Sequence, residues 1–233
     1  MIAIISSTLV PPAATSETKY RNFISNDQRL KQTEATINSL KEFTNIYVFD
    51  NSFPFISERE KDRLKPARLW SIDVFPYQNK GLSEIYLLLL GIRNLPDNVP
   101  IFKISGRYIL TEQWDFKNLK DFDFVGKFDG PKTISTRAYY FRNKNILHEV
   151  LICALNFMYA YSSRIVGPTS FIRVLKNAIN LSPEDNVFCP TISIERAMGE
   201  AIHVLSLNTQ NLKKLYIAGI SGNPDDKLKM INE

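Results

Sequence analysis

Histidine is scarce in this sequence, and its scarcity removes several kinds of catalytic site. Only two histidines are present, His148 and His203, and they lack the H-E-x-x-H spacing of a zinc site. Each falls within an expected helix, where we expect a surface or core position. The G-x-x-x-x-G-K-[ST] and G-x-G-x-x-G phosphate-binding loops and the G-x-S-x-G nucleophile elbow are also absent. P-loop chemistry and hydride transfer therefore have no support.

Cysteines and long apolar runs are scarce as well. The two cysteines, Cys153 and Cys189, have no metal-ligand spacing, and both sit in apolar surroundings, so we expect a reduced, buried pair. The opening "MIAIISSTLVPP" lacks a basic region and is expected to be a strand, not a signal peptide. The run "IYLLLLGI" is far shorter than the roughly 18 residues of a membrane span. We predict a cytoplasmic protein without a transmembrane segment.

The charge excess is mild, with a net charge of +5. Basic residues mix with acids, as in "REKDRLKPAR", and no RNP-like motif, zinc-finger spacing or long Lys/Arg run is present. Nucleic acid is therefore not the expected partner. A phosphorylated small molecule or peripheral association with an anionic membrane surface explains the excess equally well.

The first 105 residues alternate strands with helices. Strands are expected at 2–10, 45–50, 69–75 and 100–105, and helices at 26–43, from Ser57 to Pro66, and at 82–94. Such alternation predicts an α/β fold with a mostly parallel sheet. Ligands of these sheets bind at the carboxyl ends of the strands, near the switch point.

The second half changes character. Strands are expected at 122–128 and 136–142, in a more antiparallel region, and helices at 145–162, 169–180 and 194–205. Residues 187–194 read as strand or loop, 215–222 as a last strand and turn, and 223–233 as a loosely held tail. No linker divides the chain, so we predict a single domain.

Polar groups gather at the expected strand ends, at 6–8, 50–52 and 103–107. Lys103, Ser105 and Arg107 alternate along a strand and are expected to face one side. A guanidinium can bridge two phosphate oxygens, an ammonium adds a point charge, and Gly106 permits close backbone approach to a ligand. The alternative is that both cations pair with acids such as Glu84 or Asp73.

Three segments, in this order, carry a resemblance to a known family. "IYVFDNS", "QNKGLSEIYLLLLGI" and "IFKISGRYIL" resemble the strand-end turn, the N-x-G stretch and the D-x-D region of GT-A nucleotide-sugar glycosyltransferases. The "KG-x-x-E" and "KISGRY" motifs are similar to small enzymes of bacterial surface polysaccharides and of large DNA viruses. The resemblance covers about residues 2–110 and thins over 111–233.

The resemblance implies a GT-A-like domain with a nucleotide-binding half, 1–110, and a smaller antiparallel and helical acceptor-side half, 111–233. It implies transfer of a sugar from a nucleoside diphosphate donor, UDP-sugar by preference, to a glycan or lipid-linked glycan, with inversion. The family holds Mn²⁺ or Mg²⁺ with D-x-D carboxylates, where this chain has Lys103 to Arg107. We therefore predict a diphosphate site that uses cations in place of a metal; the literal Asp121-Phe122-Asp123 is the alternative metal site.

The donor-site candidates are strand-end and loop residues. They are Ser7, Thr8, Arg29, Asp50, Asn51, Ser52, Lys80, Gly81, Lys103, Ser105, Gly106, Arg107 and Arg137. For Asp50, Asn51 and Ser52 the alternative is a simple turn, which these residue types favour anyway.

An inverting transfer needs a base for the acceptor hydroxyl. Glu195 in "TISIERAMGE" is the first candidate, ahead of Glu200 and Asp129, although the helix dipole alone favours an acid in a first turn. One competing function is a nucleotidyltransferase acting on sugar phosphates, but "SSTLVPPAATSETK" lacks the glycine-rich loop it needs after the first strand. The other is a polyanion- or nucleic-acid-binding domain that uses the net positive charge.

Overall fold

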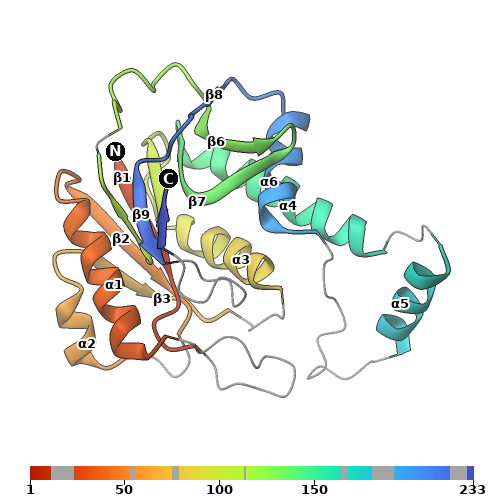
Figure 1. Ribbon diagram of the computed structural model, residues 1–233, viewed down its shortest axis with the longest axis horizontal. Coiled ribbons are helices and arrows are strands. Elements are labelled where there is room, and N and C mark those ends of the chain that lie inside the picture. The colour runs from red at the N-terminus through yellow and green to blue at the C-terminus, as the bar shows by residue number, and fades with distance from the viewer. Residues whose placement is uncertain are drawn as a thin grey trace.

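A seven-stranded sheet forms the centre of the protein (Figure 1). The computed structural model describes residues 1–11, 24–52, 56–74, 79–112, 114–163, 167–179, 192–220 and 230–233. Its strand order is β3-β2-β1-β4-β7-β6-β8. The strands are β1 (Ile2–Ser7), β2 (Asn45–Asp50), β3 (Arg68–Ser71), β4 (Ile101–Ser105), β6 (Phe124–Gly130), β7 (Thr133–Phe141) and β8 (Thr209–Asn211).

Strands β1 to β4 are parallel, and β7 alone runs against its neighbours β4 and β6. A second, three-stranded antiparallel sheet has the order β10-β9-β5. Its strands are β5 (Tyr108–Leu110), β9 (Ile217–Ile220) and β10 (Met230–Asn232). The predicted fold class, a mostly parallel sheet flanked by helices with a smaller antiparallel part, is confirmed.

Helices cover both faces of the large sheet. They are α1 (Asn26–Ser39), α2 (Glu58–Arg63), α3 (Lys80–Ile92), α4 (Lys144–Ser163), α5 (Pro168–Ile179) and α6 (Ile194–Val204). One buried apolar cluster joins the sheet to α3, α4 and α6, and a second joins the opposite face to α1 and the small sheet. Buried apolar area of this extent is the main stabilising term of the fold. Figure 1 shows α5 lying apart from both layers.

The strand order places a switch point between β1 and β4. From β1 the chain builds outward through β2 to β3, and it then returns to add β4 on the other side of β1. Helices that follow successive strands therefore diverge there, and sheets of this kind bind ligands at the carboxyl ends of the strands beside such a point. The "KISGRY" segment lies at this switch point, because β4 ends at Ser105.

Several predicted boundaries are wrong. The helix predicted to reach residue 43 ends at Ser39, because Leu40 and Phe43 continue as hydrogen-bonded turns. The strand predicted over 69–75 ends at Ser71. Strands β5, β8 and β10 were not predicted, since three-residue strands have no readable alternation of their own.

The tail is not wholly loose. Residues 230–232 form β10, which pairs with β9, while 221–229 lie outside the described residues. Cys153 is free and half-buried instead of fully buried, and burial raises the pKa of its thiol. Cys189 and most of the segment predicted as strand or loop also lie outside the described residues. No helix in the described part of the chain is long and apolar enough to cross a membrane.

Candidate functional site

Asp50, at the end of β2, holds the loop that leaves β1. Its side chain is 1% exposed, and its two carboxylate oxygens accept hydrogen bonds from the backbone N–H groups of Leu9 (2.9 Å) and Ser52 (3.1 Å). The Ser52 hydroxyl in turn accepts from the N–H of Val10 at 2.8 Å. Burial raises the pKa of Asp50, and the hydrogen bonds from Ser52 and Leu9 oppose that rise. Asp50 and Ser52 therefore shape the loop, as the alternative interpretation of this turn predicts.

Neighbouring hydroxyl and amide groups complete the loop. Thr8 donates to the side-chain oxygen of Asn51 at 2.5 Å, and Ser7 shares a hydrogen bond of 3.4 Å with Thr33 of α1. Part of the surface of these strand-end residues is open to solvent, because Ser7, Thr8 and Asn51 are all half-buried.

Lys103 is a buried ion-pair partner of Glu84. Its side chain is 0% exposed, its Nζ lies 2.5 Å from Oε1 of Glu84 on α3, and it also donates to the carbonyl of Thr136 at 2.7 Å. The ammonium faces the ring of Tyr139 at 5.3 Å. This is the alternative in which the lysine pairs with an acid, and the Lys103 ammonium is enclosed by groups of the protein itself.

A chain of polar contacts extends from this pair in two directions. The Ser6 hydroxyl, at the end of β1, donates to Glu84 Oε1 at 3.0 Å. On the other side the Thr136 hydroxyl, on β7, donates to Oε1 of Glu195 at 3.2 Å. Glu195 is half-buried in the first turn of α6, where the Ser193 hydroxyl caps the helix. Contacts therefore connect the strand end at β1 with the predicted base, across β4 and β7.

Arg107 lies close to a second arginine and an acid. It is half-buried, and within the described residues it forms no ion pair. Burial lowers the pKa of Arg29 on α1, and the positive charge of Arg107 lowers it further. Arg29 is positioned by hydrogen bonds to the carbonyls of Thr8 (3.2 Å) and Ile24 (3.3 Å). The Arg29 guanidinium contacts the loop after β1, Arg107 follows the end of β4, and the charge of Arg107 acts on Arg29. Two positive charges that act on each other in this way attract an anion.

The same positive charges also affect the pKa of Glu84. Burial alone would raise its pKa, but Lys103, the hydrogen bond from Ser6 and the charge of Arg107 together lower it. Glu84 therefore stays a carboxylate and offsets the Lys103 charge.

The two glycines of the motifs serve packing within the protein. A Cβ on Gly81 would lie 2.7 Å from Cβ of Ile194, so the glycine lets α3 meet the start of α6. A Cβ on Gly106 would lie 3.0 Å from the Thr33 hydroxyl, which donates to the Gly106 carbonyl at 3.2 Å. Lys80 is exposed at the start of α3.

Ser105 ends β4, and Arg137 lies in the middle of the neighbouring strand β7. Ser105 is half-buried and pairs in register with Ser6. Arg137 forms an ion pair with Glu233 and lies over the ring of Tyr108 at 6.0 Å. The Arg137 guanidinium is therefore paired with the carboxylate of Glu233.

The alternative metal pair, Asp121 and Asp123, lies at the opposite edge of the sheet from Arg107. Asp121 and Asp123 precede β6, which runs in the direction of β4, so they lie at the amino ends of these strands, opposite Arg107. Asp123 is bound by Arg142 at 2.8 Å and by the N–H of Asn208 at 3.0 Å. Among the described residues, no group of three or more His, Cys, Asp and Glu could hold a metal ion. Asp121 and Asp123 therefore do not form a D-x-D metal site at the end of β4.

The other base candidates are engaged. Glu200 is buried and pairs with Lys132 at 2.9 Å, and exposed Asp129 lies 3.4 Å from Lys127. The structure adds Thr136, which sequence reasoning did not assign to the site, and it shows that Ser6 donates a hydrogen bond to Glu84. Thr136 lies directly before Arg137, but only the fold shows that its hydroxyl meets Glu195.

Comparison with known proteins gives fold-level similarity. No family model matches the chain, and no curated protein matches it. The nucleoside-diphosphate-sugar pyrophosphorylase of Vibrio cholerae RC9 is 12% identical, with 97% of this chain and 98% of that chain covered and a TM-score of 0.51. Galactosyltransferase LgtC, solved with donor and acceptor sugar analogues, is 10% identical over 74% and 69%, with a TM-score of 0.46. Mouse xyloside xylosyltransferase 1 is 8% identical over 91% and 84%, with a TM-score of 0.43. The Vibrio similarity shows a shared α/β fold across nearly the whole chain.

Proposed function

We propose that this protein is a glycosyltransferase that uses a nucleoside diphosphate sugar, with UDP-sugar as the preferred donor and a glycan or lipid-linked glycan as acceptor. The supporting observation is the half-buried position of Arg107 directly after β4 at the switch point, outside any ion pair of the described residues, with its charge acting on Arg29. A guanidinium pair of this kind matches the two negative phosphates of a nucleoside diphosphate.

In this proposal the chain's own side chains perform the transfer. Glu195 takes the proton of the acceptor hydroxyl, and the resulting oxygen attacks the anomeric carbon of the donor. The bond between that carbon and the phosphate oxygen breaks, and its electron pair stays on the departing nucleoside diphosphate. Arg107 and Arg29 stabilise the added charge, and attack from the opposite face inverts the anomeric centre.

The arginine pair gives the sharpest test. Arg107→Ala is expected to weaken UDP binding about 10- to 100-fold in calorimetry, because a charge-assisted hydrogen bond is lost. Uridine binding should change little, since uridine carries no phosphate. The UDP affinity of Arg107→Lys, which keeps the charge but loses the bidentate geometry, should lie between those of the unmodified protein and Arg107→Ala. Equal losses for UDP and uridine would contradict the phosphate role, and no binding of UDP, GDP, dTDP or CMP compounds by the unmodified protein would overturn the proposal.

The nucleotidyltransferase alternative makes a different product. It predicts release of pyrophosphate from a nucleoside triphosphate and a sugar phosphate, whereas a glycosyltransferase releases a nucleoside diphosphate. Because the Vibrio protein shares the fold, the experiment also tests for nucleotidyltransferase activity. Assay of both products from the same preparation separates the two.

A further inference from the structure

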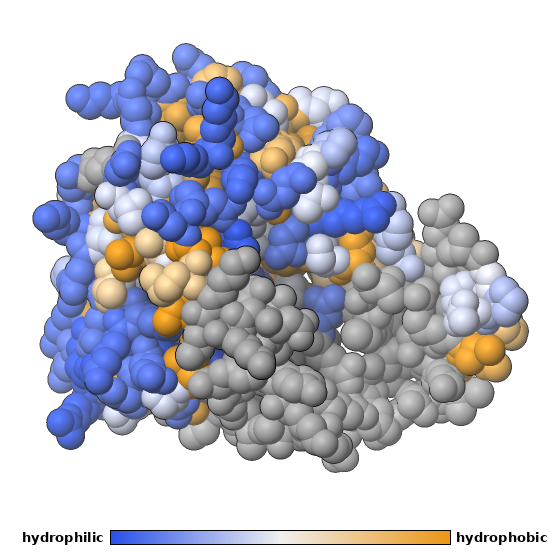
Figure 2. Space-filling model, in the orientation of Figure 1, coloured by the Kyte–Doolittle hydropathy of each residue, from blue (hydrophilic) through white to orange (hydrophobic). Residues whose placement is uncertain are grey.

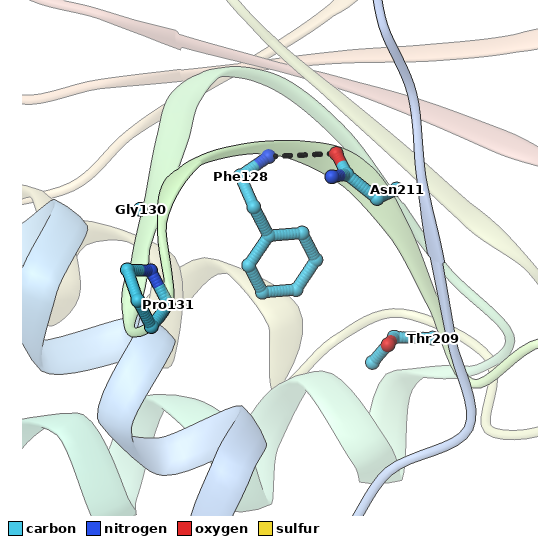
Figure 3. A pocket seen from close by; sticks show the side chains of 5 residues that line it. All are labelled: Phe128, Gly130, Pro131, Thr209 and Asn211. Atoms are coloured by element: carbon cyan, nitrogen blue, oxygen red, sulfur yellow. Dashed lines mark hydrogen bonds between the residues drawn. The ribbon is translucent and has the colours of Figure 1, made fainter.

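A pocket at the outer edge of the large sheet has no assigned role. It is lined by Phe128, Gly130, Pro131, Thr209 and Asn211 and has a volume of about 430 Å³ (Figure 3). These residues come from β6, the turn that follows it, and β8. It is a shallow hollow that is largely open to solvent, so a ligand bound there would stay partly exposed.

The pocket lies on the same edge of the sheet as the arginine pair. β6 runs in the direction of β4, and Phe124 and Ile101 both pair with Phe141. Phe128, four residues beyond Phe124, therefore lies toward the carboxyl ends of the strands.

The pocket is also close to the predicted base in the order of strands. Phe128 pairs with Ile134 of β7, two residues before Thr136, whose hydroxyl bonds Glu195. Strand β7 lies between β4 and β6 in the sheet. Arg107 follows β4, Glu195 contacts β7, and the pocket lies on β6. A ligand in the pocket would thus lie on the far side of Glu195 from the proposed diphosphate.

An aromatic ring forms the apolar part of the pocket. Phe128 is half-buried, and its ring is held edge-to-face against Phe124 with centroids 5.6 Å apart. Figure 3 shows the ring pointing into the cavity between Pro131 and Thr209. The electron-rich face of such a ring suits the weakly positive C–H face of a sugar.

Neutral polar groups complete the lining. Asn211 Oδ1 accepts from the N–H of Phe128 at 3.0 Å, which orients the amide (Figure 3). Its Nδ2 keeps two donors without a partner in the described part of the chain, and the Thr209 hydroxyl adds a donor and an acceptor. No charged side chain lines the pocket, which favours a neutral polyhydroxyl ligand over a phosphate.

We infer that this β6–β8 pocket binds one neutral sugar ring of the acceptor glycan. The inference rests on the proposed glycosyltransferase function and adds to it a position and a chemical class for the acceptor. The ring of Phe128 stacks on the sugar, while the Asn211 amide and the Thr209 hydroxyl bond its hydroxyl groups.

Binding of simple glycosides tests the inference without knowledge of the full acceptor. Methyl β-glucoside, methyl β-galactoside and methyl N-acetyl-β-glucosaminide are titrated into ¹⁵N-labelled protein. At least one is expected to shift the amide signals of residues 128, 209 and 211 saturably. Asn211→Asp keeps an oxygen for the Phe128 N–H but removes both donors, and Phe128→Leu removes the ring. Each should weaken binding about tenfold, the effect of roughly one hydrogen bond or stacking contact.

Asn156→Asp, which adds the same charge at an exposed position of α4, is the matched control and should bind the glycoside normally. Absence of saturable shifts at the pocket with all three glycosides would overturn the inference, as would unchanged binding in both pocket variants. UDP titration of the unmodified protein keeps the two proposals separate. Glycoside binding without UDP binding would contradict the proposed donor site alone. UDP binding without glycoside binding would contradict the proposed sugar pocket alone.

Discussion

The ammonium nitrogen of Lys103 lies 2.5 Å from Oε1 of Glu84, and the lysine side chain has no exposure to solvent. The pair joins the central strand β4 to α3, and its hydrogen bonds reach Ser6 on one side and Thr136 on the other. A cation that the sequence analysis predicted to bind a ligand therefore holds β1, β4, β7 and α3 together.

Removing the acid of this pair should destabilise the protein strongly. Glu84→Gln leaves a buried ammonium without its counter-charge, and we expect a loss of about 3–5 kcal/mol in unfolding free energy. Urea denaturation measures it. Glu58→Gln, which breaks the exposed Glu58–Lys61 pair, is the control and should change stability far less. A similar small loss for both variants would show that the buried pair does not carry this stability.

The same pair should make stability depend on acid pH. The pKa of Glu84 is lowered below its ordinary 4.5 in the folded protein, so the unfolded chain binds the proton more readily. The resulting stability is present above about pH 4.5 and is lost as pH falls through the lower folded pKa. Unfolding free energies measured from pH 7 to pH 3 should fall less steeply in Glu84→Gln. Parallel slopes for the two proteins would contradict this assignment.

The hydroxyl of Tyr139 should be dispensable for stability. It is buried and has no hydrogen-bond partner among the described residues, and burial raises its pKa well above 10.0. Tyr139→Phe is therefore expected to be neutral or stabilising in thermal unfolding. Tyr86→Phe is the contrasting variant, because it breaks a 2.9 Å hydrogen bond to Tyr159, and should cost about 1 kcal/mol. Destabilisation by Tyr139→Phe would indicate a partner for this hydroxyl, such as a bound water.

The predicted base should affect turnover more than donor binding. Glu195→Gln removes the proton acceptor and is expected to lower kcat about 10²- to 10⁴-fold while UDP affinity stays the same. Thr136→Val, which removes only the hydroxyl that orients Glu195, should have a smaller effect on kcat. Steady-state assays with calorimetry measure both. A Glu195→Gln enzyme with normal turnover would exclude this residue as the base.

Peripheral membrane association is predicted to involve α5. Its Phe171, Ile172 and Leu175 are 52%, 51% and 46% exposed. Figure 2 shows an apolar patch where this helix lies. Residues 168–179 include two basic residues and no acid, which favours an anionic surface. We expect sedimentation with phosphatidylglycerol vesicles but not with phosphatidylcholine vesicles, and reduced sedimentation for the Phe171→Ser/Leu175→Ser double variant. Equal behaviour of the double variant and the unmodified protein would contradict this role.

Local patterns were enough to predict much of the fold. The β2 strand was predicted with its observed bounds, and α6 within one residue, because hydrophobic periodicity and a Ser cap act within one element. The alternation of strands and helices also predicted the parallel sheet and the edge at which its polar groups gather. Short strands such as β5 and β8 escaped prediction, since their pairing partners lie far away in the sequence.

The sequence by itself determined the sheet, its carboxyl edge and the presence of cations there, because these follow from periodicity and residue type. Only the tertiary structure decided which of these cations forms an ion pair within the protein, because ion pairs form between elements distant in the chain. Lys103 is neutralised by Glu84, which comes from α3, and Asp50 is occupied by backbone N–H groups of the loop after β1. Arg107 remains beside Arg29, and the proposed diphosphate site therefore rests on this pair.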